Sequence, residues 1–193
     1  MTNIEKKQDN SEELARVKQT YIESVSSIIP GDEEEAIAIR NVIHWLQTAQ
    51  AVNKPLNMEK HLGVLCAVLS PDFRQIFLFK HKKAKLWLPP GGHVDLGLDF
   101  IQTVNLEVEE ELGVKLPIFD NKPFFLTETL TQGLNAGHID VTLWYPLIGK
   151  PDQSFVIQEK EANLAQWFEL SDIYTSPELQ HLSRAVSKLS LLY

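Results

Sequence analysis

The glutamate run in LEVEEELGV, residues 106–114, contains the carboxylates best placed to do chemistry in this chain. On a helix, Glu107, Glu110 and Glu111 share one face, because residues three and four positions apart are neighbours. Like charges at this spacing repel, and a hard divalent cation such as magnesium favours clustered carboxylate oxygens. The run therefore predicts either a solvated helix end or a cation site. Glu109 points elsewhere and is expected at the surface.

The apolar residues around the glutamates indicate which side of the helix is buried. Four of them form a stripe that should pack on a sheet: Ile101, Val104, Val108 and Leu112. Glu107 and Glu111 each precede a stripe residue by one position, so we expect them at the edge of the buried face. A purely solvating run would lie opposite the core, and this placement therefore favours the cation site.

The segment PPGGHVDLGLD leads into this helix and forms a stiff corner. Gly91 and Gly92 allow a turn that side chains forbid, and the two prolines before them restrict the approach. Asp95 or Asp99 can cap the start of the helix, and Gly113 is placed to cap its end.

Counted from Gly92, the spacing resembles the Nudix box. That pattern reads Gly, five residues, Glu, seven residues, Arg, Glu, a hydrophobic residue, any residue, Glu, Glu, any residue, Gly and a hydrophobic residue. The positions that match in register are Gly92, Glu107, Val108, Glu110, Glu111, Gly113 and Val114. GGHVD also resembles the GGHVE of many members, and LWLPPGG and WFELSDI are similar to Nudix sequence. The resemblance covers about residues 61–175.

Two positions depart from the pattern, since Leu98 stands at the first Glu position and Leu106 at the Arg position. In the family, that Arg helps to orient the neighbouring carboxylates, and that Glu can assist metal binding or hydrogen bonding. A buried Arg or Glu without its partner is costly, so losing both is a coherent change. The two leucines could pack together across the loop, and Asp95 or Asp99 could supply the missing carboxylate.

The resemblance implies a hydrolase that cleaves a diphosphate linked to another group, usually a nucleoside, with water as the nucleophile. It implies Mg²⁺ or Mn²⁺ held by Glu107, Glu110, Glu111 and the backbone carbonyl of the turn at Gly92. Glu110 and Glu111 are expected as ligands, Glu107 as a ligand or base, and one carboxylate as the acceptor of the water proton. The expected partner is a small nucleotide-type diphosphate.

Other residues are weaker candidates for substrate contacts. Lys80 and Lys82 belong to a basic cluster that could attract phosphates or could simply be a solvated hairpin loop. His138 and Asp140 stand two apart, on one face of an expected strand, and are either cleft residues or a structural pair. Glu161 lies in a loop where relatives can place an extra acid, although an exposed charged loop is the safer interpretation.

Net charge, the lengths of the apolar runs and the single cysteine limit the kinds of function that the chain can have. A net charge of -8 is a poor basis for binding nucleic acid or an anionic membrane, and no apolar run reaches the length of a membrane span. The N-terminus lacks the apolar region of a signal peptide, so we expect a cytoplasmic protein. Cys66, the one cysteine, lies in an apolar run and is expected to be a small buried residue.

The pattern of elements predicts an α+β protein, which the resemblance specifies as a Nudix-like α/β/α sandwich with a mixed β-sheet. Residues 1–55 are expected as a helical extension, with helices from Ser11 to Pro30 and from Asp32 to near Gln50. Residues 56–193 are expected as the Nudix-like domain with a short C-terminal helical tail. Its expected strands are 61–70, 75–81, 85–94, 123–132, 138–148 and 164–170, with a hairpin between the first two.

Two other function classes fit the same residues. Loss of Glu and Arg from the box suggests a catalytically weak or inactive nucleotide-binding or regulatory module, although three crowded carboxylates are unnecessary for binding alone. The amphipathic N-terminal helices suggest a scaffold, but they more simply cover the domain's own core or form the contact of a homodimer.

Overall fold

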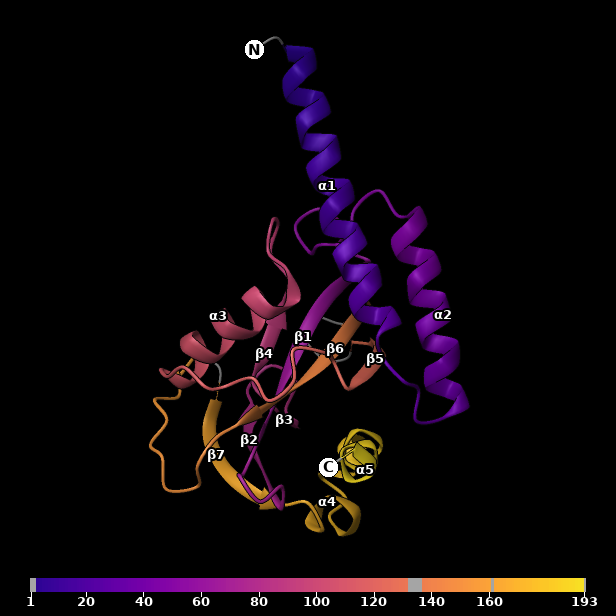
Figure 1. Cartoon of the computed structure of the whole chain (residues 1–193). Helices are drawn as coiled ribbons and strands as arrows, with labels where there is room; N and C mark the ends of the chain where they lie inside the picture. The colour runs from indigo at the N-terminus through magenta and orange to yellow at the C-terminus, as the bar shows by residue number, and fades with distance from the viewer. Residues whose placement is uncertain (1–2, 132–136, 161, 193) are drawn as a thin grey trace.

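The computed structural model describes residues 3–131, 137–160 and 162–192, with side chains described from Ala15 onward (Figure 1). The helices are α1 (Asn3–Ser26), α2 (Glu33–Thr48), α3 (Phe100–Leu112), α4 (Asp172–Thr175) and α5 (Ser183–Leu192), with a 3-10 turn at Gln180–Leu182. The strands are β1 (Lys60–Leu69), β2 (Gln75–His81), β3 (Trp87–Leu88), β4 (Gly91–His93), β5 (Phe125–Leu130), β6 (Ile139–Ile148) and β7 (Ala162–Glu169).

These strands form one mixed sheet. Its main order is β3-β2-β1-β6-β5, with β4 paired to β1 and β7 paired to β2. β1 and β6 run parallel along their whole length, whereas the other pairs are antiparallel. The mixed sheet predicted from the sequence is thus confirmed.

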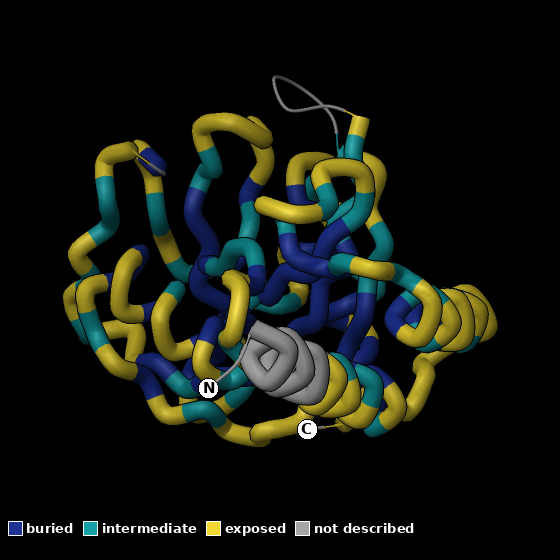
Figure 2. The backbone as a smooth tube through the Cα atoms, turned by 90° about the horizontal axis from the view of Figure 1, so that it is seen from above, coloured by how far each residue is buried: buried dark blue, intermediate teal, exposed yellow. Residues whose placement is uncertain are grey.

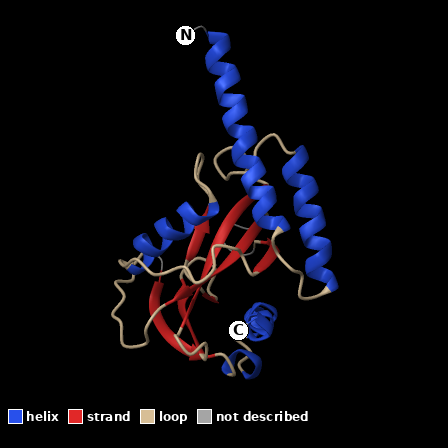
Figure 3. Cartoon of the chain, viewed as in Figure 1, coloured by secondary structure: helices blue, strands red, loops and turns tan. Residues whose placement is uncertain are grey.

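Helices cover both faces of the sheet (Figure 3). Leu62 and Val64 of β1 belong to a core shared with α1, α2 and α3, whereas Ala67 and Leu69 belong to a second core shared with α5. Alternate residues of a strand point to opposite faces, which explains why β1 is buried on both sides. The buried backbone lies at the centre of the molecule, and exposed segments surround it (Figure 2). The α/β/α sandwich is therefore confirmed.

Cys66 lies inside β1 and is fully buried. Burial raises the pKa of its thiol well above the usual value, so the thiolate is disfavoured. Its interpretation as a small buried residue is confirmed.

The predicted hairpin between the first two strands is only partly correct. β1 and β2 meet in register at Leu69 and Ile76. Farther along the same edge of β2, Phe79 and Lys80 pair with β3, and the other edge of β2 pairs with β7. β2 can pair with only a small part of β1, because other strands occupy most of both edges of β1. β6 pairs along one edge, and β4 pairs with the other edge at Gly63–Leu65. The sequence pattern showed two strands and a turn, but not the partner that each strand takes.

The two N-terminal helices pack on the domain's own core. Tyr21 and Val25 of α1 and Leu46 of α2 are buried in the same cluster as the residues of β1. Asp32 caps α2 as predicted, because its side chain accepts the amide of Glu35. α1 begins at Asn3, earlier than the predicted start at Ser11, since residues 3–10 contain no glycine or proline to stop a helix.

An ion pair inside the molecule joins α2 to α5. Lys188 Nζ lies 2.6 and 2.7 Å from the two carboxylate oxygens of Glu35, and both side chains are almost completely buried. Glu35 also accepts the backbone amides of Gly31 at 2.7 Å and Leu126 at 3.2 Å. One carboxylate thereby connects two helices and strand β5.

Among the described residues, no helix combines the length and the apolar character needed to cross a bilayer.

Candidate functional site

Helix α3 positions the predicted carboxylates. Asp99 caps its start in a reciprocal arrangement with Gln102, and Gly113, at φ 67°, caps its end in the left-handed conformation. The buried stripe consists of Val104, Val108 and Leu112, as predicted, whereas the fourth expected member, Ile101, is half-buried. The choice between Asp95 and Asp99 as the cap is settled in favour of Asp99.

Two carboxylates of α3 reach the glycine corner that strand β4 presents. Glu111, only 7% exposed, accepts the amide of Gly91 through Oε2 at 2.8 Å. A Cβ on Gly92 would lie 2.2 Å from Oε1 of Glu107, so the missing side chain is what admits this carboxylate. Both glutamates therefore lie at the edge of the buried face, as expected. Carboxylate oxygens, with a backbone carbonyl to complete the set, are donors that suit Mg²⁺ or Mn²⁺.

The other two glutamates of the run are exposed. Glu109 lies 3.5 Å from the ammonium group of Lys115, which confirms it as a surface residue. Glu110 is held through its backbone, because its carbonyl oxygen accepts the amide group of Gln158. Its carboxylate is thus left on the solvent side of the same helix turn that carries Glu111.

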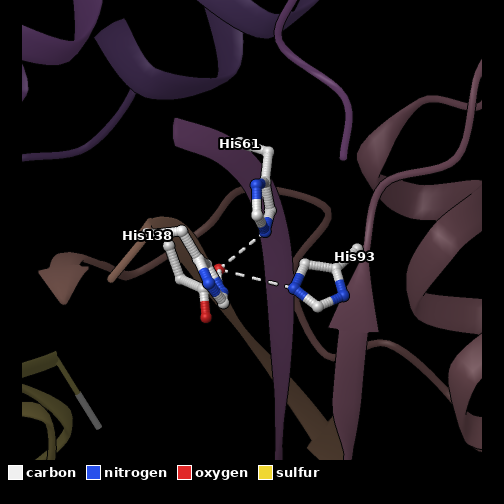
Figure 4. Close-up of side chains that lie close together, drawn as sticks. His61, His93 and His138 are labelled. Carbon is white, nitrogen blue, oxygen red and sulfur yellow. Dashed lines mark ion pairs between the residues drawn. The ribbon is translucent and has the colours of Figure 1, made fainter. Parts of the chain in front are cut away.

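A second group of side chains converges on the sheet: His61, His93, His138 and Asp140 (Figure 4). One potential ligand atom from each lies within 4.8 Å of all the others. Oδ1 of Asp140 lies 3.0 Å from Nε2 of His61, 3.4 Å from Nε2 of His93 and 3.3 Å from Nε2 of His138. His138 and Asp140 were predicted to share a face, and they do, whereas His61 and His93 were not identified from the sequence.

Strand pairing explains this convergence. His61 and Asp140 are register partners in the parallel pair β1–β6, and His93 is opposite Gly63, two residues after His61. All these positions consequently lie on one face of the sheet. The only sequence signal for His93 was its place after the two glycines, and the signal for His61 was its position at the start of a buried strand.

Burial and proximity shift the pKa values within this group. Burial lowers the pKa of His61, reinforced by His93 and opposed by Asp140. Burial alone would raise the pKa of Asp140, but the surrounding imidazoles outweigh it, so the net shift of this carboxyl is downward. The carboxylate form of Asp140 is therefore favoured.

We compared the sequence with models of known protein families. The family model of the NUDIX domain matches residues 59–189. The chain belongs to the Nudix family. The match includes α3, the glycine corner, α4 and the first part of α5.

Solved structures agree with the Nudix fold. A NUDIX-family hydrolase from Clostridium perfringens has a TM-score of 0.54 at 20% identity, over 69% of this chain and 98% of that one. A C. elegans Ap4A hydrolase in a binary complex has a TM-score of 0.55 at 18% identity, over 68% and 96%. The NUDIX domain of Shewanella oneidensis NrtR, complexed with ADP ribose, has a TM-score of 0.52 at 21% identity, over 76% and 97%. A search of curated protein sequences finds no match.

The two departures from the Nudix box occupy different surroundings. Leu106 is 38% exposed on α3. Leu98 is half-buried in the loop before α3, and its carbonyl accepts the hydroxyl of Tyr21 at 2.6 Å. Helix α1 is thereby attached to the loop of the Nudix box, which gives the N-terminal extension a direct contact with the candidate site.

The weaker candidates are spread over other parts of the Nudix domain. Lys80 lies 3.0 Å from Glu178, and Lys82 donates to the backbone carbonyl of Glu159. Glu161 lies outside the described residues. Three aromatic side chains of the sheet region are buried core residues: Trp87, Phe124 and Phe125.

Replacing Gly92 with alanine should lower the rate of hydrolysis while leaving the stability of the fold nearly unchanged. The new Cβ would displace the flexible end of Glu107, so we expect hydrolysis to fall at least about tenfold. The free energy of unfolding should change by less than about 1 kcal/mol, because no backbone atom is in the way.

Gly91→Ala is the matched contrast for this prediction. Its Cβ would lie 2.2 Å from the backbone oxygen of Val64, so this variant should lose stability by about 1–3 kcal/mol. Rates measured beside urea unfolding curves distinguish the two variants. Unchanged hydrolysis in Gly92→Ala would show that the position of Glu107 is unimportant.

Proposed function

We propose that this Nudix protein is a metal-dependent hydrolase of nucleoside diphosphates linked to another group, and that water attacks phosphorus. The observation that carries the proposal is the approach of Glu107 and Glu111 to the glycine corner of β4. Three carboxylates within five residues of one helix would repel one another without a cation, and the register of the Nudix box places them here.

Each residue of the box has a role in this proposal. Glu107, Glu110, Glu111 and the carbonyl of Gly92 would hold Mg²⁺ or Mn²⁺, which when bound neutralises pyrophosphate charge. The Gly91 amide fixes one oxygen of Glu111 and thus the orientation of its carboxylate. Glu107, wedged against Gly92, is the residue that we propose takes the proton from water if it is not a metal ligand.

Substrate contacts outside the box are also proposed. Lys82 is the better of the two lysine candidates, because its ammonium group is held by a neutral backbone carbonyl, that of Glu159, whereas the ammonium group of Lys80 is paired with the carboxylate of Glu178. A lysine near the site would offset the repulsion between a phosphate and a chain of net charge -8. Glu161 stays a proposed contact on sequence grounds.

A substrate panel tests the proposal. The purified protein would be assayed with a nucleoside diphosphate sugar, a dinucleoside polyphosphate and a nucleoside triphosphate, each with Mg²⁺ or Mn²⁺. We expect nucleoside monophosphate or phosphate release from at least one of them, and its loss when a chelator removes the metal. Absence of release from every member would favour the alternative function, a nucleotide-binding or regulatory module.

Restoring the missing box residues tests whether the departures weaken the enzyme. The double variant Leu98→Glu with Leu106→Arg is expected to raise the turnover rate, because the arginine can orient the carboxylates of α3. The exposure of Leu106 gives room for the longer side chain. Steady-state rates of the double and both single variants provide the measurement. Unchanged turnover in a folded double variant would show that the site is adapted to its leucines.

A further inference from the structure

The group formed by His61, His93, His138 and Asp140 lies apart from the Nudix carboxylates. Gly92 and His93 are neighbours in β4, and neighbouring residues of a strand point to opposite faces. Glu107 of α3 reaches the face of Gly92, so His93 and its three companions lie on the other face of the sheet. The two groups therefore share a strand and no side chain.

Hydrogen bonds fix which nitrogen of two of the rings carries the proton. Nδ1 of His61 lies 3.0 Å from the carbonyl oxygen of Asn57, and a carbonyl only accepts, so Nδ1 donates. The hydroxyl of Thr131 donates to the carbonyl of His138 at 3.0 Å and accepts from Nδ1 of the same residue at 3.1 Å. In both neutral rings Nε2 thus presents a lone pair.

These lone pairs point at an oxygen that can only accept. Nε2 of His61 and Oδ1 of Asp140 are both buried, and neither has a hydrogen-bond partner in the described part of the chain, although they lie 3.0 Å apart. A buried acceptor facing another acceptor is costly unless a cation lies between them. The side chain of His61 is fully buried, so solvent cannot supply the missing partner.

The three separations from the carboxylate oxygen match those between ligands of a tetrahedral metal, and all four potential ligand atoms lie within 4.8 Å of one another. Zinc–nitrogen bonds of about 2.0 Å place neighbouring ligand atoms about 3.3 Å apart. The three nitrogen–oxygen distances in the group are 3.0, 3.4 and 3.3 Å. Backbone or side-chain acceptors on the far nitrogen of a ligating imidazole are the usual second contact of such sites, and Asn57 and Thr131 provide them.

We propose that His61, His93, His138 and Asp140 bind a zinc-type divalent ion, separate from the Mg²⁺ or Mn²⁺ of the Nudix box. Imidazole nitrogens favour zinc, cobalt and nickel, whereas Mg²⁺ prefers an all-oxygen set. This role replaces the substrate contact first expected of His138 and Asp140, since a central carboxylate repels a phosphate. The bound ion ties β4, which carries the glycine corner, to β1 and β6.

Metal binding without substrate tests the proposal independently of hydrolysis. The chelator-treated full chain, without any histidine tag, would be titrated with Zn²⁺ against a chromophoric chelator, and with Co²⁺ by visible absorption. We expect one equivalent of Zn²⁺ to bind with a Kd below about 1 µM. We also expect the absorption of tetrahedral Co²⁺, no competition from millimolar Mg²⁺ and a higher melting temperature with Zn²⁺.

Variants locate the ion. His93→Ala, at the most exposed of the four side chains, and Asp140→Asn should each weaken Zn²⁺ binding at least about tenfold. His44→Gln, at an exposed histidine of α2, and Glu110→Gln should bind Zn²⁺ as the unmodified chain does. Equal affinity in folded His93→Ala and Asp140→Asn, or binding lost in Glu110→Gln, would overturn the assignment. Binding of much less than one equivalent of Zn²⁺ to the unmodified chain would also overturn the assignment. In that case a protonated imidazole, and not a metal ion, would supply the positive charge beside Asp140.

Discussion

Replacing Glu110 with glutamine is expected to lower the rate of phosphate or nucleoside-monophosphate release at least about 100-fold. The substitution keeps the shape of the side chain and removes the charge needed to hold a divalent ion or accept a proton. Its carboxylate is exposed and only its backbone is held, by Gln158, so the fold should be unaffected. The measurement is steady-state product release with Mg²⁺, on whichever substrate of the panel is turned over.

Glu109→Gln provides the matched control for this prediction. Glu109 is adjacent in the same helix turn, is also exposed and lies 3.5 Å from the ammonium group of Lys115. A surface pair of this kind contributes little, so the control should retain its rate within about twofold. Equal rates in Glu110→Gln and the unmodified chain would remove Glu110 from the catalytic site.

Replacing Glu35 with alanine is expected to destabilise the fold by about 3–5 kcal/mol. The side chain of Lys188 is only 6% exposed, and the change removes the carboxylate that balances its charge. Burial already lowers the pKa of Lys188, and Glu35 is the first group that opposes this shift. The amides of Gly31 and Leu126 would lose their acceptor as well. Urea unfolding at neutral pH, with the slope compared between variants, measures the loss.

Two further variants distinguish loss of the buried ion pair from a general loss of stability in α2. Glu34→Ala removes an exposed carboxylate 2.5 Å from Arg184 and should cost less than about 1 kcal/mol. Glu35→Leu combined with Lys188→Met removes both charges and should be much less destabilised than Glu35→Ala. A loss below about 1 kcal/mol in Glu35→Ala would mean that the pair does not hold α5 against α2.

Local spacing was enough to predict the carboxylates and their helix. Residues within one or two turns of one another determine each of these features: the glycine corner, the cap at Gly113 and the stripe that ends at Leu112. Interactions of that range depend on helix geometry alone, so they can be inferred before the fold is known. The boundary at Asp32 was predictable for the same reason.

The complete histidine group could not be predicted, because only His138 and Asp140 are close in sequence and the other members come from distant parts of the chain. His61 and Asp140 become neighbours only through the parallel pairing of β1 with β6, and no local pattern specifies that pairing. His93 joins them because β4 takes the edge of β1 that a simple hairpin would have given to β2. The same competition explains why the hairpin prediction was only partly correct, and it shows that strand partners decide which polar side chains meet.

The most direct test of the account is the fate of oxygen from water during hydrolysis by the unmodified chain. The reaction would be run with Mg²⁺ in ¹⁸O-labelled water on a substrate identified in the panel, and the products analysed by mass spectrometry. Attack on phosphorus predicts one labelled oxygen per turnover in a phosphate group of the products, and none in the presence of a chelator. Label carried on carbon instead, or in no product, would contradict hydrolysis at the pyrophosphate bond.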